Sequence, residues 1–68
     1  MSPAKIAATE AALDNAGLEI VTTRNGAAIS AQTSCRHLPT VERHPLNGTA
    51  YSSANEARKT AAAFFARA

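Results

Sequence analysis

Apolar residues recur at helical spacing near the N-terminus of this chain. Four residues separated by three, four and three positions form the predicted buried face of a helix: Ile6, Thr9, Leu13 and Ala16. Ser2 can accept a hydrogen bond as the N-cap, and Pro3 suits the first helical position. Gly17 tolerates the left-handed conformation that ends many helices. The pattern therefore predicts a helix over residues 4–16.

The next segment alternates between apolar and polar residues, as a half-buried β-strand does. Residues 18–24 and 27–33 both alternate, and Asn25-Gly26 lies between them. Asn-Gly favours a type I′ hairpin turn, because both turn positions require a positive φ. A turn centred there places Thr22 opposite Ile29. The predicted core face of the hairpin contains six apolar or β-branched residues: Leu18, Ile20, Thr22, Ile29, Ala31 and Thr33.

Residues 34–48 are predicted to form a long irregular loop. They contain Pro39, Pro45, Asn47-Gly48 and both histidines of the chain, and such residues interrupt regular structure. Within this loop, the segment from Thr40 to Arg43 is predicted as a short strand. Residues 49–51 are predicted as a further short strand that leads into the last helix.

The last helix is predicted to run from Ala54 to the end of the chain. Ser53 and Glu56 are three residues apart, as in a capping box. Glu56 and Lys59 are spaced so that they can pair on the outside of the helix. The apolar stripe of the helix contains Ala57, Ala61, Phe64, Phe65 and Ala68.

The order of these elements predicts a single α+β domain over residues 1–68, with the order α-β-β-(β)-β-α. Two helices packed on one face of a small antiparallel sheet would bury every apolar face named above. A chain of 68 residues has a small core, and its seventeen alanines each bury little area. One cysteine excludes an intramolecular disulfide. The remaining sources of stability are a bound metal, self-association into a homodimer or a bound partner; without them the chain is a monomer of low stability.

Charge and hydropathy restrict the location and the partner. The net charge is +2, and the seven lysines and arginines are spread along the chain, unlike the concentrated basic face of most nucleic-acid-binding proteins. No apolar run approaches the ~20 residues of a membrane span, and no signal peptide is evident. We therefore expect a cytoplasmic protein that makes no membrane contact.

The sequence does not favour metal binding or catalysis. Cys35 and His37, with Glu42 and His44 further along, match no common zinc-ligand spacing. A cysteine nucleophile would need a base and an oxyanion site on a rigid scaffold, and a chain of this length leaves little room for them. We therefore expect no metal, no cofactor and no enzymatic activity.

Arginine and histidine gather in the 34–48 loop. Loops on a rigid scaffold commonly carry binding residues, and arginine is enriched at protein interfaces. The predicted partner-binding residues are Arg36, His37, Arg43, His44 and Tyr51. Very short chains without a catalytic signature are often regulators or inhibitors, including those carried by phages and other mobile elements. The sequence therefore predicts a small non-enzymatic regulator or inhibitor that acts by contact with another protein.

The order helix, three strands, helix resembles the double-stranded RNA-binding domain, and the last helix resembles that family in sequence as well. The matching residues are Ser53, Ala57, Arg58, Ala61 and Ala62, with Gly48 near the glycine-rich entry of the family. Two lysines that would contact phosphates are replaced here by Ala54 and Asn55. The longer first hairpin loop of the family, which enters the RNA minor groove, is replaced by Asn25-Gly26.

The resemblance implies an alternative function as a nucleic-acid-binding module. Its candidate contact residues are Arg24, Arg58 and Lys59, together with the first helix. Because phosphate contacts make binding depend steeply on salt concentration, this alternative predicts retention of duplex RNA or DNA at low salt.

Overall fold

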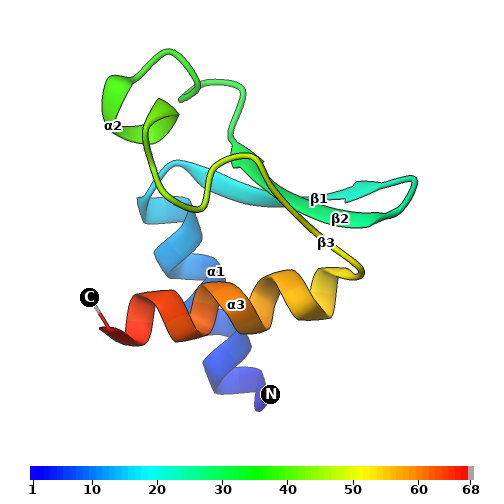
Figure 1. Cartoon of the computed structure of the whole chain (residues 1–68). Coiled ribbons are helices and arrows are strands. Elements are labelled where there is room, and N and C mark those ends of the chain that lie inside the picture. The colour runs from blue at the N-terminus through cyan, green and yellow to red at the C-terminus, as the bar shows by residue number, and fades with distance from the viewer. Residues whose placement is uncertain (68) are drawn as a thin grey trace.

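The computed structural model describes residues 1–67 and shows a three-stranded antiparallel sheet with its two long helices on one of its faces (Figure 1). The α+β fold predicted from the sequence is confirmed. The elements in chain order are α1 (Pro3–Asn15), β1 (Leu18–Thr23), β2 (Gly26–Ala31), α2 (Pro39–Glu42), β3 (Thr49–Tyr51) and α3 (Ala54–Arg67).

The first helix has the predicted ends. Ser2 caps α1, because its Oγ accepts a hydrogen bond of 3.2 Å from the backbone N–H of Lys5. Gly17 follows the helix with a φ of 75°, in the left-handed region that glycine adopts without a steric penalty. Thr9 and Leu13 are the buried residues of α1, which confirms the predicted face.

The hairpin forms, but its predicted turn is wrong. Thr23 pairs with Gly26, so the turn residues are Arg24 and Asn25. Among residues 1–67, positive φ occurs at glycines alone, so Asn25 lacks the conformation that a type I′ turn requires. Gly26 belongs to β2 instead, with a φ of 145°.

The predicted core face survives this error. Ile20, rather than Thr22, lies opposite Ile29, and this is a shift of two positions. Because side chains alternate with a period of two along a strand, a shift of two leaves every residue on its face. Leu18, Ile29 and Ala31 are buried and Ile20 is half-buried, but Thr22 and Thr33, which were predicted for the same face, are exposed.

The predicted strand from Thr40 to Arg43 is wrong, because α2 occupies this position. Pro39 is the first residue of α2, and its fixed φ is compatible with the first turn of a helix. The order of strands in the sheet is β1-β2-β3, with β3 paired to β2.

The last helix, α3, packs against all three strands and covers the core on one face of the sheet. Ser53 caps α3 by accepting a hydrogen bond of 3.1 Å from the N–H of Glu56, and Glu56 pairs with Lys59 at 3.8 Å as predicted. Ala57 and Ala61 are fully buried, and their small side chains let α3 lie close to its neighbours. Ala68, the last residue of the predicted stripe, lies outside the described residues.

Among residues 1–67 the core is one small cluster of nine buried apolar residues: Leu13, Leu18, Ala27, Ile29, Ala31, Val41, Leu46, Ala57 and Ala61. Val41 and Leu46 come from the 34–48 loop, so this loop is part of the core rather than an appendage. Within residues 1–67, no helix combines the length and the apolar character that crossing a membrane requires.

Candidate functional site

The 34–48 loop is a regular series of turns. The backbone N–H groups at positions 35, 38, 41, 44 and 47 each donate to the carbonyl three residues earlier, at distances of 2.8–3.1 Å. The N–H of Gly48 then donates to the carbonyl of Ile29 at 2.8 Å, which returns the chain to the sheet. Because these backbone groups are paired, the loop is an ordered platform despite its lack of long elements.

Asn47 fixes this platform to the sheet. Its Oδ1 accepts a hydrogen bond of 3.1 Å from the N–H of Ala31, at the end of β2. Its Nδ2 donates to the carbonyls of Val41 at 3.2 Å and of Glu42 at 3.3 Å. One side chain therefore joins the end of β2 to α2.

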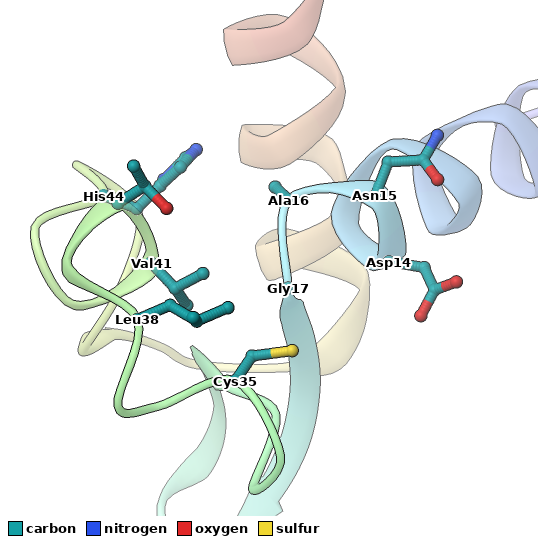
Figure 2. A pocket seen from close by; sticks show the side chains of 9 residues that line it. Asp14, Asn15, Ala16, Gly17, Cys35, Leu38, Val41 and His44 are labelled. Atoms are coloured by element: carbon teal, nitrogen blue, oxygen red, sulfur yellow. The ribbon is translucent and has the colours of Figure 1, made fainter.

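The loop packs against the end of α1 around an open hollow of about 390 Å³. Cys35, Leu38 and Val41 direct their side chains toward the backbone of Gly17 (Figure 2). A Cβ at Gly17 would lie 2.8 Å from Val41 Cγ2, so glycine permits this close approach. The remaining lining residues are Asp14, Asn15, Ala16, Thr40 and His44.

Leu38 is the apolar residue that the hollow leaves open to solvent. Its exposed fraction is 40%, and Met1 is the other large hydrophobic residue with comparable exposure among residues 1–67. Arg36 and His37 immediately precede Leu38 and are both exposed. Arg43 is exposed as well and immediately precedes His44, which lines the hollow. The exposed Leu38 thus follows an exposed arginine and an exposed histidine directly in the chain.

The structure separates Tyr51 from this group and leaves His44 only partly accessible. Tyr51 lies in β3 opposite Ala27, toward the hairpin turn and away from the end of β2 that leads into the loop. His44 is half-buried, and its ring centroid lies 5.4 Å from that of Phe64. His44 Nδ1 accepts a hydrogen bond of 3.1 Å from the N–H of Leu46. His44 therefore supports the loop more than it presents a free side chain.

The two contacts of His44 predict a graded response to substitution. We expect His44→Phe to keep the ring contact with Phe64 but to leave the N–H of Leu46 unpaired, at a cost of about 1 kcal/mol. His44→Asn should lose the ring contact but keep an acceptor, because asparagine commonly accepts from the N–H two residues on. His44→Ala should lose both and be the least stable in urea denaturation. A fully stable His44→Phe variant would contradict the role of the hydrogen bond.

Cys35 and His44 line the same hollow, but Val41 and Leu38 lie between them in Figure 2. His44 Nδ1 accepts its hydrogen bond from the N–H of Leu46, and Cys35 Sγ lies 3.8 Å from Ser34 Oγ. Each of the two side chains thus has a polar neighbour other than the other one. Among the described residues, no three His, Cys, Asp or Glu side chains are grouped closely enough to share a metal ion.

The residues of the nucleic-acid alternative are partly neutralised by carboxylates. Arg58 Nε lies 3.1 Å from Glu10 Oε1, which links α3 to α1. Lys59 pairs with Glu56 on the same helix. Arg24 is exposed at the hairpin turn. Two of the three cations therefore already have a partner of opposite charge.

Sequence reasoning missed Leu38 and Asn47. A large apolar residue within a polar segment was an available signal for Leu38. The sequence held no such signal for Asn47, because its hydrogen bond with the N–H of Ala31 joins residues 16 positions apart in the chain. Comparison of the chain with protein-family models, with curated proteins and with solved structures gives no match.

Proposed function

We propose that this chain is a non-enzymatic binding protein that contacts another protein through the loop surface, which we define as Arg36, His37, Leu38, Arg43 and the adjoining hollow. The observation that carries the proposal is the exposure of Leu38 beside an open, mainly apolar hollow. An exposed leucine next to an unfilled hollow offers apolar area that a partner can remove from water.

The arrangement of the loop surface supports protein as the partner. Protein interfaces combine an apolar centre with a polar rim, and arginine is among their enriched residues. In this proposal Leu38 supplies the centre, and the exposed Arg36 and Arg43 of the same loop supply the rim. The turns of the loop and the bonds of Asn47 hold the backbone in place, which reduces the entropy lost on binding.

The chemistry of the surface supports one kind of partner. The hollow suits an apolar side chain that inserts beside Leu38, and Arg36 and Arg43 suit carboxylates at the edge of the same partner segment. A domain of this size that binds in this way acts by occupying a surface of its partner. A regulator or inhibitor is the functional class that fits this mode of action.

Nucleic-acid binding, as the resemblance to the double-stranded RNA-binding domain would imply, has less support. Arg58 and Lys59 would have to exchange Glu10 and Glu56 for phosphates. A titration with duplex RNA and duplex DNA at low salt distinguishes the two functions, since contacts to several phosphates give tight binding there.

The proposal predicts that reversing two charges of the loop surface abolishes partner capture. Arg36→Glu combined with Arg43→Glu should leave the fold intact, because both side chains are exposed. Loss of both rim contacts should weaken binding by about tenfold or more. Affinity capture from the native host, read by quantitative mass spectrometry, measures the effect.

Lys5→Glu combined with Arg67→Glu is the matched control. It produces the same change in net charge on two exposed residues of α1 and α3, outside the loop surface. Capture of the same protein by the wild-type chain and by this control, but not by the Arg36/Arg43 variant, is the expected result. Equal capture by all three proteins would refute the assignment of the loop surface.

A further inference from the structure

The chain contains two Asn-Gly dipeptides, Asn25-Gly26 and Asn47-Gly48. In such a dipeptide the backbone nitrogen of the glycine can attack Cγ, the side-chain carbonyl carbon of the asparagine. Glycine favours this attack, because it has no Cβ beside its nitrogen and its backbone adopts many conformations. Both dipeptides therefore carry the same reactive chemistry, and their surroundings in the fold decide which of them reacts.

The reaction needs water and a base, and no oxidant or reductant. The base removes the proton of the glycine nitrogen, and a bond forms between this nitrogen and Cγ. The bond between Cγ and Nδ2 breaks, and Nδ2 takes up a proton and leaves as ammonia. Water then opens the resulting succinimide ring at one of its carbonyl carbons. The product is either aspartate or isoaspartate, in which the main chain runs through the side-chain carbons.

Asn25 lies in the hairpin turn, where it is exposed. None of the side-chain hydrogen bonds found within residues 1–67 involves Asn25. Gly26 is held by its pairing with Thr23 and by the nearby backbone of β3. That pair is the last of the β1–β2 ladder, and the ends of a ladder open at little cost. The fold therefore slows this site only in part and leaves Asn25 free to turn toward the glycine nitrogen.

Asn47 is held at every group that the reaction uses. Its Oδ1 accepts from the N–H of Ala31 at 3.1 Å, and its Nδ2, the leaving group, donates to two carbonyls of α2 at 3.2 and 3.3 Å. The nucleophile is engaged as well, because the N–H of Gly48 donates to the carbonyl of Ile29 at 2.8 Å. Cγ of Asn47 approaches the Gly48 nitrogen only after these bonds break, and each broken bond makes the reactive conformation rarer.

We propose that Asn25 is the deamidation site of the folded protein, and that the hydrogen bonds which fix the 34–48 loop protect Asn47 from the same reaction. Deamidation at Asn25 places a carboxylate beside Arg24 and lowers the net charge of +2 by one. As isoaspartate it also lengthens the backbone of the turn. The hairpin turn lies at the end of the sheet opposite to α2 (Figure 1), so the loop surface is unchanged and the inference does not depend on the proposed function.

Incubation of the full chain at physiological temperature and pH tests the proposal. Peptic digestion in acid, where the glycine nitrogen keeps its proton, followed by mass spectrometry measures the conversion of each amide to an acid. In the folded chain Asn25 should convert at least about tenfold faster than Asn47. Asn15 and Asn55 are exposed but are not followed by glycine, so they should convert more slowly than Asn25. In concentrated guanidinium chloride the rates at Asn25 and Asn47 should become similar.

Two matched variants identify the site in the intact protein. The acidic form that accumulates in the folded wild type on ion-exchange chromatography should be absent from Asn25→Gln, because glutamine would have to form a larger ring. It should persist in Asn55→Gln. Equal rates at Asn25 and Asn47 in the folded wild type would overturn the proposal, and so would an Asn25 that converts no faster than Asn15. A difference between Asn25 and Asn47 that persists undiminished in guanidinium chloride would also overturn it, since the fold would then not be its cause.

Discussion

Gly26→Ala is expected to remove most of the stability of the domain. The backbone oxygens of Tyr51 and Ser52 approach Gly26 so closely that an alanine Cβ would collide with them. Pairing of Ala27 with Tyr51 holds this part of β3 in place, so the backbone cannot yield without loss of the strand. The φ of 145° adds a conformational penalty. Together these effects should cost about 3–4 kcal/mol in urea denaturation.

Gly48→Ala is the matched control for this substitution. Gly48 also has a positive φ, of 83°, but no heavy atom lies within 4 Å of the position that its Cβ would occupy. This variant should lose about 1 kcal/mol through backbone strain alone. If Gly26→Ala and Gly48→Ala were equally stable, the close approach of β3 to Gly26 would be disproved.

Asn47→Asp is expected to release the 34–48 loop, although the two side chains have nearly the same shape. The carboxylate can still accept from the N–H of Ala31. It cannot donate, and its second oxygen would face the carbonyls of Val41 and Glu42. Two lost hydrogen bonds and this repulsion should cost about 2–3 kcal/mol. Because Val41 and Leu46 belong to the core, the loss should appear in global unfolding as well as in amide exchange of the loop.

Asn47→Ala and Asn55→Ala are the reference variants against which the loss of stability in Asn47→Asp is compared. Asn47→Ala also leaves the N–H of Ala31 without its acceptor, so it should be at least as damaging as Asn47→Asp. Asn55 is exposed on α3, and its replacement should change stability by less than about 0.5 kcal/mol. An Asn47→Asp variant as stable as Asn55→Ala would show that Asn47 does not fix the loop.

Local sequence signals predicted the parts of the fold that depend on neighbouring residues. Ser2 and Ser53 cap their helices by bonds that reach three residues along the chain, and Gly17 ends α1 by its own backbone preference. The alternation of apolar residues placed Leu18 and Ile29 on the core face, since burial of one face constrains the strand directly.

Long-range contacts decided what the sequence did not predict. Asn25-Gly26 is locally favourable for a type I′ turn. In the structure Gly26 lies in β2 instead, where the lack of a side chain allows the backbone of Tyr51 to come close. That approach cannot be read from the residues around the turn. The contribution of the 34–48 loop to the core depends in the same way on a distant contact, the hydrogen bond that the N–H of Ala31 donates to Asn47 Oδ1.

The candidate site was predicted in part. Arg36, His37 and Arg43 are exposed on the loop, where the sequence placed a contact surface. His44 lines the hollow but is half-buried against Phe64, and Tyr51 lies apart from it in β3. The predicted contact residues that are exposed are therefore the ones whose positions do not depend on core packing.

Site-specific photo-crosslinking at position 38 tests most directly whether Leu38 lies at the centre of a protein contact. A photoreactive amino acid replaces Leu38 in the native host, and the control carries it at the exposed Ala63 of α3. The prediction is a cross-link to one protein from position 38, absent from position 63 and lost when Arg36→Glu and Arg43→Glu are added. Identical cross-links from both positions, or cross-links from position 38 to nucleic acid alone, would contradict it.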